Sequence, residues 1–176
     1  MSTATLLTTL LRHKAWADDG LIAGLAAIGN DASSDEFDEF DELDTALRLF
    51  HHAHIVDRIF VAHLQRVGHG HRATEADETP PREALFDAIR QTDRWLVDYA
   101  AGLVEPGLEE PIAFRFTDGT AGTMSRAEML AHLVAHGGYH RGEIGRILTR
   151  LTGSSPRDTL TGYLHEAEPA RRVHAA

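Results

Sequence analysis

The sequence contains no cysteine among its 176 residues. This absence excludes disulfides, cysteine-based zinc sites, iron–sulfur clusters and a protein thiolate nucleophile. A bound metal would have to be held by histidine, aspartate or glutamate side chains. Any thiol chemistry would need a thiol supplied from solution.

The chain is also short of positive charge and of long apolar runs. Its 17 lysines and arginines face 27 acidic residues, which gives a formal net charge of −10 with neutral histidines. This balance argues against binding a nucleic acid backbone, which requires clustered cations. No apolar run reaches the ~18 residues that would predict a membrane span, and the first residues lack the basic start of a signal peptide. We therefore expect a cytoplasmic protein.

Apolar periodicity predicts one helical domain over residues 1–166 and a tail over 167–176. The spacing of apolar residues predicts four long helices, at residues 4–28, 43–67, about 81–102 and about 126–151, and a short helix near 158–166. Together they predict an all-α, four-helix bundle.

Two segments between these helices have a different character. Residues 111–123 alternate in polarity around a turn at Asp118-Gly119 and predict a short β-hairpin between helices 3 and 4. The acidic segment 31–44 predicts a solvated loop that leads into the second helix, and a partner-binding segment is the alternative.

Histidine is the most informative residue type, with 12 copies in the chain. His136 and His140 are four residues apart on the fourth predicted helix, so their imidazoles lie on one face. Such a pair is expected by chance on the order of once in a chain of this composition, so it needs support from its surroundings. A third histidine from a facing helix would complete a metal site with open coordination positions. His132, one turn earlier, could extend this site or hydrogen-bond at its edge.

The second predicted helix offers three candidates for the third ligand: His51, His52 and His54. Adjacent helical residues point about 100° apart, so we expect only one of them to face the metal. The pair Gly137-Gly138 costs the fourth helix roughly 1 kcal/mol per residue relative to alanine. It indicates open space or close backbone approach near a site, and tight helix packing is the alternative.

The segments H-x-x-x-H-R-G-E-I and L-F-H-H-x-x-x-x-D-R-I-F resemble those of the DinB-like (DinB/YfiT) family of proposed metalloenzymes. The resemblance implies a four-helix bundle that carries a three-histidine metal site and a hairpin before the last helix. Its register assigns the metal ligands to His52, His136 and His140. His51 and His54 are then expected at the surface or at the mouth of the site.

The chain departs from the family pattern near this site. Trp16 matches, whereas the family commonly has other residues at His13, Asp18, Tyr139 and Glu143.

His13 and Glu143 are therefore our candidates for catalytic residues. We expect helix 1 to pack beside helix 2, so that His13 lines the metal pocket without binding the metal; the alternative is a solvent-facing side chain. Glu143 could orient a ligand imidazole or form a surface ion pair with Arg146 or Arg150.

Three neutral imidazoles leave the full charge on a divalent metal, which can then activate water or bind an anion such as a thiolate. Zn²⁺ is the first expectation, with Ni²⁺ or Fe²⁺ as alternatives. The resemblance implies hydrolysis of a small molecule or transfer involving a low-molecular-weight thiol. A non-catalytic, stress-associated metal-binding protein is the alternative function. We also expect a homodimer.

Overall fold

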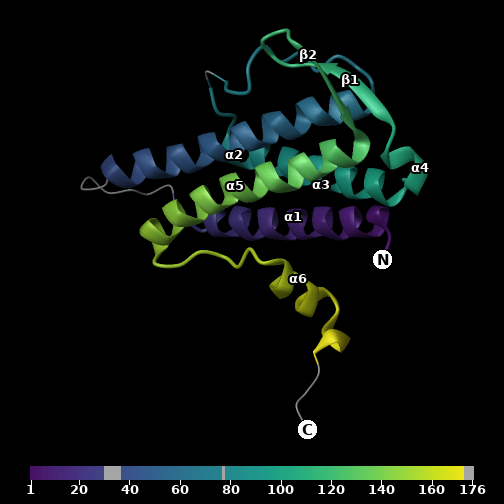
Figure 1. The fold of residues 1–176 in the computed structure, drawn as a ribbon. Coiled ribbons are helices and arrows are strands. Elements are labelled where there is room, and N and C mark those ends of the chain that lie inside the picture. Colours follow the sequence, from purple (N-terminus) through teal and green to yellow (C-terminus); the bar gives the residue numbers. More distant parts are fainter. Residues whose placement is uncertain (30–36, 77, 173–176) are drawn as a thin grey trace.

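The computed structural model describes residues 1–29, 37–76 and 78–172. Four long helices lie side by side in a bundle (Figure 1). They are α1 (Thr3–Ala26), α2 (Phe37–Leu64), α3 (Arg82–Ala101) and α5 (Arg126–Thr152). The predicted all-α bundle is confirmed, and α1, α3 and α5 match their predicted ranges to within a few residues. Helix α2 begins at Phe37, well before the predicted start at residue 43, so the end of the predicted acidic loop is helical.

The shorter elements connect or extend the bundle. They are α4 (Glu105–Leu108), β1 (Pro111–Arg115), β2 (Ala121–Ser125), α6 (Leu160–Ala167) and the 3-10 helix η1 (Pro169–Arg171). Strands β1 and β2 pair antiparallel, with Phe114 opposite Gly122, and Gly119 adopts a positive φ of 88° in the turn between them. The predicted hairpin is therefore confirmed. The single turn α4 was not predicted, because four residues give no readable periodicity.

Local sequence signals define both ends of α5. Ser125 accepts a hydrogen bond from the backbone N–H of Glu128, and the Glu128 carboxylate accepts one from the backbone N–H of Ser125. This reciprocal capping satisfies two donors that the helix itself cannot pair. At the other end Gly153 adopts a left-handed conformation with φ 80°, which glycine tolerates without strain. The ends of α5 thus hold His136 and His140 at fixed positions along the bundle.

The arrangement of the helices differs from the expectation for helix 1. Helix α1 packs mainly against α3 and α5, and α2 packs mainly against α5. The prediction that helix 1 lies beside helix 2 is therefore wrong. The acidic segment 31–44, which connects the first two long helices, gave no indication of which helices would pack together. Its later part lies in α2, which begins at Phe37, and residues 30–36 lie outside the described residues.

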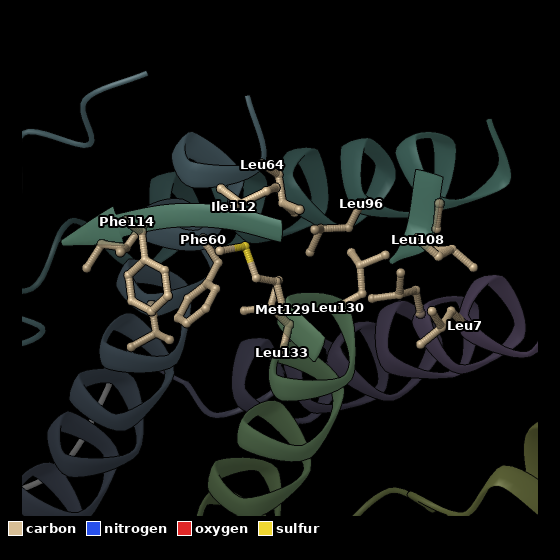
Figure 2. Packing of buried hydrophobic residues seen from close by; sticks show 14 of the residues in the cluster. Leu7, Phe60, Leu64, Leu96, Leu108, Ile112, Phe114, Met129, Leu130 and Leu133 are labelled. Carbon is tan, nitrogen blue, oxygen red and sulfur yellow. The ribbon is translucent and has the colours of Figure 1, made fainter. Parts of the chain in front are cut away.

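The apolar core is divided into two clusters along the bundle. The cluster next to the hairpin includes Phe60, Leu96 and Leu133, and Figure 2 shows Phe60 and Phe114 side by side in it. The cluster at the other end includes Phe86 and Ile144. Along all four long helices, polar and charged residues separate the two clusters in sequence. The functional site is built in this polar layer.

Within the described residues, no helix combines the length and apolar character needed to cross a membrane.

Candidate metal centre

Three histidines converge in the polar layer, one from α2 and two from α5. His52, His136 and His140 each offer a ring nitrogen, and these atoms all lie within 4.8 Å of one another. The Nε2 atoms of His136 and His140 are 3.2 Å apart. The ring centroids of His52 lie 5.3 Å from His136 and 4.7 Å from His140. The structure therefore brings together the three residues that the sequence singled out.

Outer contacts fix which nitrogen of two imidazoles faces the centre of this group. Nδ1 of His52 lies 3.0 Å from the backbone carbonyl oxygen of Thr74. Since a carbonyl only accepts, Nδ1 carries the proton and Nε2 keeps its lone pair. Nδ1 of His140 likewise lies 2.8 Å from the carboxylate of Glu143. Metal-binding histidines are typically oriented by such a carbonyl or carboxylate on the far ring nitrogen.

His136 is half-buried and is neutral at physiological pH. Burial, followed by the nearby charges of His140 and His52, lowers the pKa of His136 to about 4. Its Nδ1 is buried without a hydrogen-bond partner among the described residues. A neutral imidazole is the protonation state that binds a metal.

The donor set fits a divalent metal. Tetrahedral ligands at ~2.0–2.1 Å from zinc are about 3.3 Å apart, close to the 3.2 Å between the Nε2 atoms of His136 and His140. With the proton of His140 on Nδ1, its Nε2 presents a lone pair to Nε2 of His136, and this approach suits a proton on His136 or a cation shared by the two rings. Within the described residues no carboxylate or further imidazole joins the group. The three ligands would therefore leave coordination positions open.

The other histidines considered from the sequence lie outside this group. His132 stacks on Phe60, with ring centroids 4.7 Å apart, and adjoins His136 at 5.5 Å. His51 lines the cavity in front of the site. His54 is only 5% exposed, and its Nε2 lies 3.1 Å from the Thr92 hydroxyl of α3. The expectation that His54 lies at the surface or mouth is wrong, because two residues turn an α-helix by about 200° and direct it to the opposite side of α2.

The two catalytic candidates occupy different environments. Glu143 contacts the ligand His140, while Arg150 pairs with Glu42 instead. His13 is 8% exposed, and its Nε2 lies 3.0 Å from the carboxylate of Asp158. His13 does not line the cavity in front of the metal ligands. Its side chain lies in the contact between α1 and the segment after α5. Both the prediction that His13 lines the pocket and the alternative of a solvent-facing side chain are therefore wrong.

A cavity of about 300 Å³ opens onto the histidine group. His52 and His140 form its inner wall, and Arg48 and Glu75 are among its polar lining residues. The volume is at the lower end of the range for small-molecule sites. A ligand of modest size could thus reach both imidazoles from this side.

Sequence reasoning missed a buried ionic cluster behind the histidines. Lys14, the only lysine in the sequence, directs its Nζ to the carboxylates of Asp18 at 2.8 Å, Asp57 at 2.8 Å and Asp93 at 2.6 Å. Arg141, next to the ligand His140, adds a longer contact of 3.4 Å to Asp18. Each of the four long helices therefore contributes a charge to one cluster.

The charges in this cluster nearly cancel. Burial alone would lower the pKa of Lys14, but the three carboxylates outweigh it and raise that pKa well above its usual value. Burial raises the pKa of Asp93 to about 8. With Asp93 protonated near neutral pH, Lys14 and Arg141 face the carboxylates of Asp18, Asp57 and Asp158, the last of which pairs with Arg141 at 2.7 Å. The sequence signal was present, because Lys14 and Asp57 interrupt the apolar faces of their helices.

Comparison with known proteins agrees with this arrangement. A family model described as the DinB family matches residues 1–172 of the 176. No curated protein and no solved structure gives a significant match.

Proposed function

Because the chain belongs to the DinB family, we propose that it is a metal-dependent enzyme acting on a small molecule. His52, His136 and His140 would hold one divalent metal through their Nε2 atoms. The observation that carries this proposal is the convergence of three imidazoles in which two far-side nitrogens already have oxygen partners.

A metal bound here would supply a Lewis acid that lowers the pKa of water or binds a thiolate. Zn²⁺ is the first expectation and Ni²⁺ or Fe²⁺ are alternatives, since imidazole suits all three. The reaction class is hydrolysis or transfer involving a low-molecular-weight thiol. Since the chain has no cysteine, that thiol would come from solution.

The protein's own groups would position ligands and substrate. The carbonyl of Thr74 holds the proton of His52 on Nδ1, and Glu143 does the same for His140. Both contacts direct Nε2 lone pairs to the metal. In the cavity, the guanidinium of Arg48 is available to an anionic part of the substrate, although it also pairs with Asp44 at an exposed position.

A non-catalytic metal-binding protein is the second candidate. A closed structural site would require a fourth protein ligand, and no described histidine or carboxylate completes the group. The cavity of about 300 Å³ in front of two ligands also favours access by a substrate. We propose the enzyme for these two reasons. Homodimer formation and a cytoplasmic location stay predictions.

The test is metal content followed by activity. Protein purified without a histidine tag should contain about one divalent metal per chain by mass spectrometry of the metals, and His136→Ala should lose it. His132→Ala is the matched control on the same helix and should keep the metal. The metal-loaded protein is then screened for hydrolysis of esters and amides and for consumption of small thiols with electrophiles. Full metal retention by His136→Ala would overturn the ligand assignment, and retained turnover without metal would overturn the metal-dependent reaction.

A further inference from the structure

A second cavity, of about 420 Å³, lies between α2, α3 and the segment that follows α2. None of the three metal ligands lines it. Its base is formed by His54, which points about 200° around α2 from His52 and meets the Thr92 hydroxyl at 3.1 Å. This cavity is therefore separate from the one in front of the histidine group.

Cationic and hydrogen-bond-donating side chains surround the second cavity. Arg58 lies on one side, and His69 and His71 form part of the outer wall. Although the protein carries a net charge of −10, no aspartate or glutamate is among the described residues that line this cavity. An acidic protein thus presents a local region in which positive charge has no carboxylate beside it.

The positive charge of Arg58 acts on the imidazole of His71 in this cavity. Burial lowers the pKa of His71, and the positive charges of Arg58 and His69 lower it further. No carboxylate is among the causes of this shift. With His71 neutral, Arg58 is the fixed positive charge of the described lining, and a bound anion would pair with it without displacing a carboxylate.

The lining of this cavity combines a hydrogen-bond donor with apolar surface. Nδ1 of His69 accepts a hydrogen bond from the backbone N–H of His71 at 3.0 Å, so the neutral ring carries its proton on Nε2 and can donate. Apolar surface from Val61 and the half-buried Trp95 completes the lining. Ligand sites usually combine such apolar walls with a few placed polar groups, in volumes of ~300–1,000 Å³.

We propose that this cavity binds a small organic carboxylate. The Arg58 guanidinium would pair with the carboxylate, which matches its planar two-pronged geometry. Imidazole donors would add hydrogen bonds, and an aromatic or aliphatic body would rest against Trp95. A single guanidinium suits one carboxylate better than a phosphate dianion, which favours the organic acid.

The test uses benzoate as the probe and the metal-loaded protein, with binding followed by calorimetric titration and by amide chemical shifts. Benzoate should bind and shift resonances of α2 and α3 around the cavity, while neutral benzamide should bind at least about tenfold more weakly because it lacks the charge. Arg58→Gln and Gln91→Glu, both at exposed positions of the lining, should each weaken benzoate binding about tenfold or more. Arg94→Gln, an exposed arginine of α3 outside the lining, is the matched control and should bind like the unmodified protein.

Three results would overturn the proposal. Equal binding of benzamide and benzoate would show that charge plays no part. Unchanged benzoate binding in Arg58→Gln would place the anion elsewhere, the metal included. Inorganic phosphate binding as tightly as benzoate would show that the apolar wall contributes nothing.

Discussion

Glu143 and His140 are joined by a hydrogen bond of 2.8 Å between the carboxylate and Nδ1 of the ring. The two residues are three apart on α5, so the helix itself holds them in contact. The side chain of His140 is 12% exposed, whereas that of Glu143 is 40% exposed. The carboxylate thus reaches in from the surface and orients a buried ring.

Replacing Glu143 should therefore weaken metal binding in a graded way. We expect Glu143→Ala to lower metal affinity about ten- to a hundredfold, as is typical when an outer partner of a histidine ligand is lost. Glu143→Gln should lose less, because its amide oxygen can still accept the hydrogen bond. Competition with a chromophoric chelator measures both affinities. Glu83→Ala on α3, whose carboxylate only approaches Arg82 at 3.9 Å, is the control. Equal affinity in all three variants would remove Glu143 from the site.

The glycines of α5 should respond oppositely to alanine. A Cβ at Gly142 would meet no atom within 4 Å, whereas one at Gly137 would lie 3.0 Å from Nη1 of Arg141 and 3.2 Å from Cε of Lys14. We expect Gly142→Ala to stabilise the fold by about 1 kcal/mol through helix propensity alone. Gly137→Ala should destabilise it, because Lys14 is held by three carboxylates and cannot move aside. Urea unfolding measures the stability of both variants. Stabilisation by both would contradict the conclusion that Gly137 is needed for close packing against Lys14 and Arg141.

The pH dependence of stability should report the proton on Asp93. Burial raises the folded-state pKa of Asp93 to about 8, above its ordinary value of 3.8. The folded protein then keeps a proton that the unfolded chain releases, so this contribution is complete below pH ~4 and is lost as pH rises toward ~8. In Asp93→Asn the contribution is absent. We expect the unfolding free energy of the unmodified protein, relative to Asp93→Asn, to fall between about pH 5 and about pH 8.

The comparison of the two proteins isolates this one group. Titration of His54 and His136, whose pKa values are lowered to about 4, stabilises the fold as pH rises from about 4 to 6.5. That effect is present in both proteins and cancels in the difference. Parallel stability curves over the whole range would show that Asp93 is ionised in the folded state.

The core beside the hairpin should be sensitive to loss of volume. Leu133 is fully buried, one turn before His136 on α5. We expect Leu133→Ala to cost about 2–5 kcal/mol of unfolding free energy, because the rigid surroundings cannot fill the cavity. Leu6→Ala, at a position that is 38% exposed, should cost much less. Denaturant titration compares the two, and equal small effects would indicate a loosely packed core.

The sequence predicted the helices, the hairpin and the three clustered histidines better than it predicted which helices pack together. His136 and His140 could be placed together because four residues on one helix fix their direction. His52 could be chosen over His51 and His54 only through the resemblance to a family. The three side chains point in different directions around α2, and the sequence does not tell which of these directions faces another helix. The structure supplies that neighbour, which is α5 for His52 and α3 for His54.

The ionic cluster was harder to predict for a different reason. Lys14 and Asp18 are four apart and their contact follows from helix geometry. Asp57 and Asp93 join them from other helices, so their contacts depend on the arrangement of the bundle. Likewise, the contact of His13 with Asp158 depends on how the segment after α5 folds back onto α1. Periodicity identifies which face of a helix is buried, and it does not identify the partner.

The position of Lys14 has a consequence for the chemical reactivity of the folded protein. The chain has no other lysine, and the side chain of this one is 3% exposed. Its ammonium is also held charged by the carboxylates around it, whereas acylating reagents attack the free amine. Acylation of the ε-amine is therefore blocked until the bundle opens. The rate at which this single ε-amine is acylated would measure how often the bundle opens at Lys14, without an introduced label.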